Sequence, residues 1–267
     1  MINLKFLTVL LFHNDEDLVE DQIKYYHEEN KQDLIVFSHN SSDKTNDILK
    51  HNEEKFLCIY YMDEEISFKN NMVHTYIYDT LKNQNKKNNK FVKINNKNYI
   101  NYNYSEEYDW ISFPESDEFL EGPDRKKIFI EHLIDIDKNK NINKIQYTNY
   151  IFWFTSKDNL DIKSPVERIK YYSLKKKCRK RIYSWRGNKT IRRWFGHDAS
   201  NDNEDEICIW KTRHYEIRSL DHFLKKIEDR KGVSMKGTNS HYKRMYNMRI
   251  KDKDYGIIKS DELFYDD

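Results

Sequence analysis

The sequence predicts an α/β fold, with a mostly parallel central sheet flanked by helices and a smaller mixed C-terminal portion. Apolar runs of strand length alternate with segments of helical spacing through residues 4–113. The runs are nearly continuous, which is typical of strands buried on both faces of a parallel sheet. Aromatic residues make up 15% of the chain, so we expect a core despite a mean hydropathy of -1.01 and 34% charged residues.

The first half of the chain supplies the alternation. The run LKFLTVLLF at 4–12 predicts the first strand, and the acidic turn after it predicts a helix N-terminus, where carboxylates are favourable. The same pattern then predicts helix 18–29, strand 34–38, a helix through 48–49, strand 56–61, helix 70–81 and strand 109–113. Right-handed βαβ crossovers should connect these strands. Residues 82–104 are rich in Lys and Asn, which predicts a surface excursion or a disordered insert.

The second half predicts a mixture of elements. They are helix 125–136, one or two strands within 143–154, a turn into an extended segment at 164–169, a short strand at 207–210 and helix 220–230. The apolar stripe of the last helix is expected to pack in the core.

Charge and cysteine content narrow the class of protein. The net charge is +2, from 47 basic and 45 acidic residues, so we do not expect a dedicated nucleic-acid binder. Three widely spaced cysteines fit reduced thiols in a cytoplasmic protein. The opening apolar run is too short to cross a membrane, which takes about 20 residues. We therefore expect no transmembrane segment, and a cytoplasmic location that includes peripheral contact with a membrane surface.

An acidic loop follows the strand at 109–113. Pro114 breaks the strand, and Glu115, Asp117 and Glu118 then lie within four consecutive positions. Mg²⁺ and Mn²⁺ take oxygen ligands, so clustered carboxylates after a buried strand predict a divalent metal site. The plainer interpretation is a polar turn.

Polar loops follow two further strands, at 13–15 and 39–43. In open α/β sheets, ligands bind outside the carboxyl ends of the strands, near the point where the strand order switches. We therefore expect these two loops and the acidic loop to meet at one edge of the sheet.

Several segments together resemble one family. HNDEDLVEDQIKYY, LIVFSHNSSDKTNDIL and DWISFPESDEFLE are similar to successive motifs of family 2-like glycosyltransferases of the GT-A fold. The nearest subset has a strand followed by D-x-D-E-F. SPVERI, GNKTIRRWFGHD and RHYEIRSLDHFLKKI resemble the Glu-Arg, Lys-then-His and His-Tyr-x-x-Arg-Ser segments of that subset. The resemblance covers roughly residues 4–230.

This resemblance implies a single GT-A, Rossmann-like domain over residues 1–267. Its nucleotide-sugar and metal-binding half would be 1–122, and its acceptor-side half 123–267. The implied activity is a metal-dependent, inverting hexosyl- or related transferase of glycan biosynthesis, with Mn²⁺ or Mg²⁺ as cofactor. It would move a sugar from a UDP- or GDP-sugar donor to a hydroxyl of a glycan, lipid-linked or protein acceptor.

The resemblance also implies roles for residues of the three loops. Asp117 matches the metal-binding Asp of D-x-D, and Glu115 stands where the first Asp is usual, one methylene longer, as a metal and donor ligand. Asn14 and Asp15 match an Asn-Glu pair, with Asp in place of Glu, at the nucleoside end of the donor. Asp43 matches an acid near the base or ribose, although it could instead be an N-cap.

Further candidates lie near the metal motif and in the second half. Lys189 and His214 are expected to contact the donor diphosphate, and His197 to contact the metal; Arg192 and Arg193 could share the diphosphate charge. An inverting reaction needs a group that accepts the proton of the acceptor hydroxyl, and Glu118 and Glu167 are the candidates. His214 could instead be a structural, hydrogen-bonded histidine.

Two alternatives remain open at this point. The basic, aromatic stretch 175–193 could line a nucleic-acid groove or face an anionic membrane, although a solvated face is the commoner outcome. Combined with the acidic loop, it keeps a metal-dependent nuclease or nucleotidyltransferase open. The other alternative is a non-catalytic binding protein on the same fold.

Overall fold

A computed structural model describes residues 4–62, 72–81, 92–95, 102–124, 127–139, 142–155, 157–174, 181–186, 206–230 and 264–266. The chain divides into two compact units. The first comprises 1–149 and 178–212, and the second 150–177 and 213–267. Two of the three boundaries fall inside strands, so β7 (Ile142–Trp153) and β10 (Glu206–Ile217) contribute residues to each unit. The expected functional halves, 1–122 and 123–267, stay a prediction.

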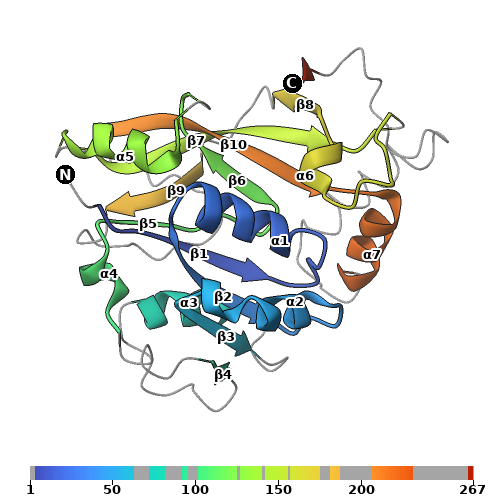
Figure 1. Ribbon diagram of the computed structural model, residues 1–267, viewed down its shortest axis with the longest axis horizontal. Coiled ribbons are helices and arrows are strands. Elements are labelled where there is room, and N and C mark those ends of the chain that lie inside the picture. Colours follow the sequence, from blue (N-terminus) through green and yellow to red (C-terminus); the bar gives the residue numbers. More distant parts are fainter. Residues whose placement is uncertain are drawn as a thin grey trace. The chain divides into compact units, whose positions relative to one another are not determined.

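The first unit is built on a parallel sheet (Figure 1). Its strands are β1 (Phe6–Phe12), β2 (Asp33–His39), β3 (Cys58–Met62) and β5 (Trp110–Ser112), in the order β5-β1-β2-β3. Antiparallel neighbours extend both ends of this sheet: β4 (Val92–Ile94) pairs with β3, and β9 (Arg181–Arg186) with β5. The predicted α/β class with a mostly parallel central sheet is therefore confirmed.

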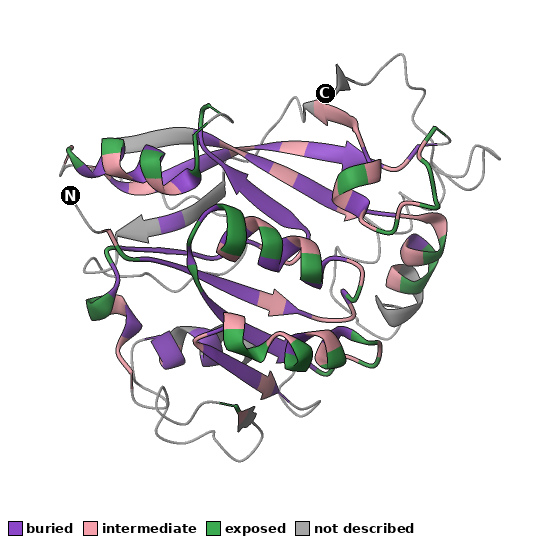
Figure 2. Ribbon diagram, viewed as in Figure 1, coloured by how far each residue is buried: buried purple, intermediate pink, exposed green. Residues whose placement is uncertain are grey.

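The central strands are buried on both faces because both sets of alternating side chains are apolar. On β1, Phe6, Leu10 and Phe12 pack in one core cluster, while Leu7 and Val9 pack in another. On β2 the neighbouring positions divide between the same two clusters. Figure 2 shows the resulting burial along both strands. The apolar runs are thus continuous because each face of the strand packs in its own core cluster.

Helices connect the parallel strands. Between β1 and β2 the chain forms α1 (Val19–Gln22), which continues as the π-helix η1 (Ile23–Glu29). The remaining helical segments among the described residues of this unit are α2 (Thr45–His51), the 3₁₀ turn η2 (Glu53–Lys55), α3 (Met72–Leu81), α4 (Tyr104–Glu107) and α5 (Phe129–Asp137). The helices predicted at 18–29, 48–49, 70–81 and 125–136 are confirmed, with ends shifted by a few residues.

The second unit is smaller and mixed. The end of β7 pairs antiparallel with β8 (Tyr171–Leu174), and β8 pairs with β11 (Phe264–Tyr265). Its described part includes the helices α6 (Pro165–Arg168) and α7 (Leu220–Arg230). The Phe152 ring lies between the Tyr172 ring at 5.4 Å and the Tyr215 ring at 4.8 Å, measured between centroids. Aromatic packing therefore joins three strands of this unit.

Three sequence predictions need correction. Residues 165–168 form a helical turn instead of an extended segment, because Ser164 Oγ accepts a hydrogen bond from the Glu167 amide and Pro165 suits the first helical position. The strand predicted at 207–210 runs on to Ile217. The acidic loop leads into an additional strand, β6 (Glu118–Glu121), which pairs with β10.

Among the described helices, none combines the length and the apolar character that crossing a bilayer requires.

Candidate active site

The loop after β1 is shaped by one residue in the left-handed region. Asn14 has a φ of 57°, a conformation that Asn tolerates better than most residues. Its side chain is held in place, because Asn14 Oδ1 accepts hydrogen bonds from the Ser42 amide at 2.7 Å and from Ser42 Oγ at 3.2 Å. The Asn14 amide donates to Ser41 Oγ at 3.2 Å. Asn14 therefore ties the loop after β1 to the loop after β2.

Two carboxylates, one from each of these loops, accept backbone amides of the opposite loop. Asp43 Oδ2 accepts from the Glu16 amide at 3.1 Å, and Glu16 Oε2 accepts from the Lys44 amide at 2.9 Å. Asp43 Oδ1 accepts from the Thr45 amide, the first residue of α2, at 2.9 Å. Thr45 Oγ1 in turn accepts from the Asp15 amide at 3.0 Å. The Asp43 carboxylate thus has a structural role at the start of α2, and its expected contact with the donor stays a prediction.

The acidic loop lies at the same edge. Glu115 forms an isolated parallel bridge with Leu11 of β1. Asp15, buried to 8% exposure, accepts a hydrogen bond from Ser116 Oγ at 2.7 Å through Oδ2. The loop after β1 is therefore hydrogen-bonded both to the loop after β2 and to the acidic loop. These loops lie at the carboxyl end of β1, which is paired with β2 on one side and β5 on the other. The strand order switches at β1, and ligands of open α/β sheets bind next to such a switch.

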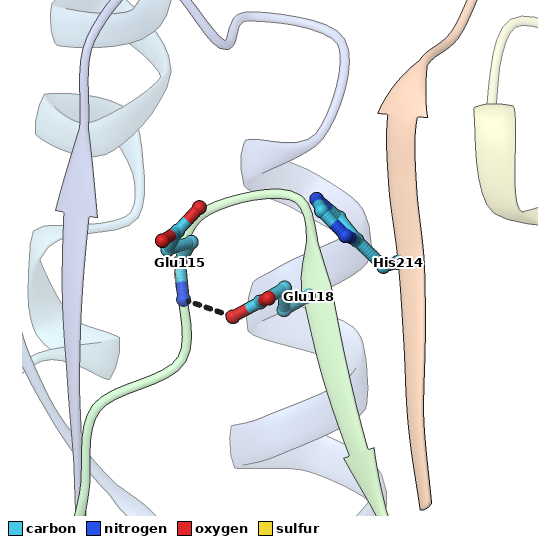
Figure 3. Close-up of side chains that lie close together, drawn as sticks. All are labelled: Glu115, Glu118 and His214. Atoms are coloured by element: carbon cyan, nitrogen blue, oxygen red, sulfur yellow. Dashed lines mark hydrogen bonds between the residues drawn. The ribbon is translucent and has the colours of Figure 1, made fainter. Parts of the chain in front are cut away.

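The three acids of the loop lie in different surroundings. Glu118 Oε2 accepts from the Glu115 amide at 3.0 Å, a contact drawn in Figure 3, which also labels His214 on β10. The Glu118 side chain is fully buried, Asp117 is 6% exposed, and Glu115 is half-buried. Carboxylate oxygens are the donor set that Mg²⁺ and Mn²⁺ prefer, so the residues present suit such an ion.

Helix side chains support the acidic loop from within the core. Gln22 of α1 and Tyr26 of η1 both donate hydrogen bonds to the Glu118 carbonyl oxygen, at 3.1 Å each. The sequence interpretation missed both residues, as well as Ser116, Ser41 and Thr45. The sequence predicts only a helix at 18–29, and no local signal marks the residues whose side chains hold the loops.

The predicted site residues divide into three groups. The structure brings together those of the first unit: Asn14, Asp15, Asp43, Glu115, Asp117 and Glu118. Lys189 and His197, like Arg192 and Arg193, fall outside the described residues. Glu167, exposed on α6, and His214, buried on β10, belong to the second unit, and their roles stay predictions.

Two of the family-like segments contact each other inside the second unit. Arg168 donates to the carbonyl oxygens of Ile162 at 3.1 Å and Lys163 at 2.8 Å, and to that of Arg218 at 2.8 Å. Arg168 belongs to SPVERI and Arg218 to RHYEIRS. The guanidinium therefore joins these segments through backbone carbonyls.

No known family model matches the chain, and neither does any curated protein. Among solved structures it is similar to three crystal structures of TarS from S. aureus, each with a TM-score of 0.39. The first shares 10% identity and covers 90% of this chain, which spans 41% of that structure's length. TarS 1-349 shares 10% identity with this chain, and the match covers 90% of this chain and 68% of TarS 1-349. The complex of TarS 1-349 with UDP shares 9% identity, and that match covers 93% of this chain and 73% of the other. Likeness at this level carries no argument about function.

Proposed function

We propose that the chain is a glycosyltransferase that moves a sugar from a nucleoside-diphosphate sugar to an acceptor hydroxyl, with a divalent metal ion at the acidic loop. The observation that supports this best is the hydrogen-bonded junction of the loops after β1, β2 and β5. It lies at the carboxyl edge of the parallel strands, where α/β sheets bind nucleotides. The order of family-like motifs along residues 4–230 points to the same chemistry.

In this proposal Asp117 and Glu115 hold the metal. A bound Mg²⁺ or Mn²⁺ would act as a Lewis acid toward the diphosphate leaving group. Asn14 and Asp15 would orient the nucleoside end, since both sit in the loop after β1 that Ser41, Ser42 and Thr45 hold in place. Lys189 and His214 are the cations proposed for the diphosphate, and His197 a further metal ligand.

The proton acceptor of an inverting reaction would be a carboxylate of this chain. Glu118 already accepts a hydrogen bond from the Glu115 amide and is fully buried, so its observed role is to shape the loop. Glu167 is exposed, which suits contact with an incoming acceptor. Glu118 and Glu167 therefore both stay candidates for the general base of the proposed reaction.

Donor binding can be tested by thermal shift of the full chain with Mn²⁺ and a panel of UDP- and GDP-sugars. A ligand at 100 times its Kd stabilises the folded state by roughly 2.7 kcal/mol, so one donor should raise Tm by several degrees. Asp117→Ala should abolish this Mn²⁺-dependent shift. Asp47→Ala, the same change at an exposed position of α2, should leave it intact.

Two outcomes would contradict the proposal. One is the absence of a shift with every nucleotide sugar in the presence of Mn²⁺. The other is salt-dependent binding and metal-dependent cleavage of oligonucleotides, which would favour the nuclease alternative.

A further inference from the structure

The acidic loop rests on a hydrogen-bonded support that belongs to α1 and η1. Gln22 is fully buried, and its Nε2 donates to the Ser116 carbonyl oxygen at 2.7 Å and to the Glu118 carbonyl oxygen at 3.1 Å. These two carbonyls flank Asp117 in the chain. One side chain therefore holds the peptide group before Asp117, the residue proposed to bind the metal, and the peptide group after Glu118.

Tyr26 fixes the next part of the same segment. Its hydroxyl donates to the Glu118 carbonyl oxygen at 3.1 Å and accepts from the Leu120 amide at 2.9 Å. The side chain is fully buried, and burial raises the pKa of the Tyr26 phenol well above its usual value of 10.0. The phenol therefore keeps its proton and remains a donor throughout the neutral range.

Two consecutive tyrosines of the π-helix η1 contact one strand. The Asn30 amide donates to the Tyr25 carbonyl oxygen, the i→i−5 pairing of a π-helix, at 3.1 Å. Tyr25 Oη donates to the Leu120 carbonyl oxygen at 2.7 Å, so Tyr25 and Tyr26 both contact β6. The Phe119 ring packs against both rings, at centroid distances of 5.3 and 6.3 Å. Single π turns within helices occur frequently at functional sites.

From these contacts we infer that Gln22 and Tyr26 are positioning residues that orient the Asp117 and Glu115 carboxylates for the divalent cation. The inference rests on the proposed function, because it needs the cation to bind at this loop. Neither side chain is assigned a contact with the ion. Both act through the backbone of residues 116–120, as groups that orient metal ligands do elsewhere, and changing such groups typically weakens metal binding by about 10- to 100-fold.

The test uses the full chain with Gln22→Met, which keeps the volume and removes the donors, and with Tyr26→Phe. The matched control is Tyr108→Phe, because Tyr108 is also buried in the first unit and donates to Asp33 Oδ2 at 2.8 Å, away from the acidic loop. The Kd for Mn²⁺ alone is measured by calorimetry, at a temperature where circular dichroism shows each protein fully folded. Amide hydrogen exchange at Leu120 is measured on the same samples.

We expect Mn²⁺ affinity to fall about 10-fold or more in Gln22→Met and Tyr26→Phe, and to stay within about twofold in Tyr108→Phe. Exchange at Leu120 should accelerate in Tyr26→Phe and not in the control. If the wild type binds Mn²⁺ and either folded variant binds it equally well, the positioning role of that residue is refuted while the proposed function stands. If the wild type does not bind Mn²⁺, the metal site of the proposed function fails, and the positioning role fails with it.

Discussion

Some acids at the sheet edge accept backbone amides and build the loops, whereas others are proposed to hold the metal. Residue type alone does not distinguish these two roles. Asp43 and Glu16 each accept backbone amides from the neighbouring loop, so these carboxylates build the edge. Asp15 also accepts from the His13 amide at 3.1 Å, in addition to its contact with Ser116. The sequence predicted that acids would gather here. It could not predict which amide each acid would accept, because that depends on the register of loops about 30 or 100 residues apart.

Gly122, which follows β6, lies so close to the His132 ring that a side chain does not fit between them. A Cβ at this position would lie 2.1 Å from Cδ2 of the His132 ring. His132 cannot move freely, because it is 8% exposed, its Nε2 is 2.8 Å from the Asp124 carbonyl oxygen, and its ring lies 5.6 Å from that of Trp210.

Gly122→Ala should therefore destabilise the protein by about 1–3 kcal/mol, the usual cost of overpacking a core. Urea unfolding measures the change. The double variant Gly122→Ala, His132→Ala removes the clash and should cost less than the sum of its single changes. An unchanged unfolding midpoint in Gly122→Ala would show that the ring moves without cost.

At the scale of elements, long apolar runs were predictable and short or continued strands were not. β1 and β2 follow from their composition alone, since both faces of each strand are apolar. β6 was missed because EFLE follows a Pro-containing acidic loop and its pairing partner, β10, begins at Glu206, far along the chain. The π-helical geometry of η1 was also missed, because helical spacing in the sequence does not separate an α-helix from a π-helix.

The end of η1 depends on Asn30. Asn30 is 6% exposed; its Nδ2 donates to the Tyr25 carbonyl oxygen at 2.8 Å, and its Oδ1 accepts from the Phe129 amide at 2.7 Å. The side chain thus connects the end of η1 to the start of α5.

Asn30→Ala should cost about 1–3 kcal/mol of unfolding free energy, because it leaves the buried Phe129 amide without this acceptor. The control is Asn52→Ala: Asn52 is half-buried and bonds only locally, to the Ile48 carbonyl oxygen at 3.0 Å, so its loss should cost less. Equal losses of stability in the two variants would refute the special role of Asn30.

At the scale of the whole molecule, the sequence predicted the class of fold and the edge that carries the polar loops. Both follow from alternating elements and from the rule that parallel strands end on one side. It did not predict the division into two compact units, two of whose three boundaries lie inside β7 and β10. Strands that span two units leave no change of composition to mark the boundary.

The tyrosine-rich core predicts the behaviour of the protein in alkali. Burial raises the pKa of Tyr60 well above the usual 10.0 and that of Tyr76 to about 12. These phenols ionise near pH 10.0 once the chain unfolds, so their contribution to stability is complete below that pH and is lost as the pH rises through the folded-state values.

Unfolding and phenolate absorbance should therefore rise together above about pH 10.0. In Tyr60→Phe the loss of stability between neutral and alkaline pH should be smaller than in the wild type, although the contact with Tyr104 Oη is removed at every pH. Phenolate absorbance that is complete before circular dichroism changes would contradict this prediction.

The proposed glycosyltransferase holds its sugar donor through a divalent cation at residues 115–118. This binding is tested most directly by calorimetric titration of the wild type and Asp117→Ala with the nucleotide sugar identified by thermal shift, with Mn²⁺ and again with chelator. We expect saturable binding by the wild type in Mn²⁺ only, and none by Asp117→Ala. Equal affinity in the two proteins, or binding that persists after the metal is removed, would contradict it.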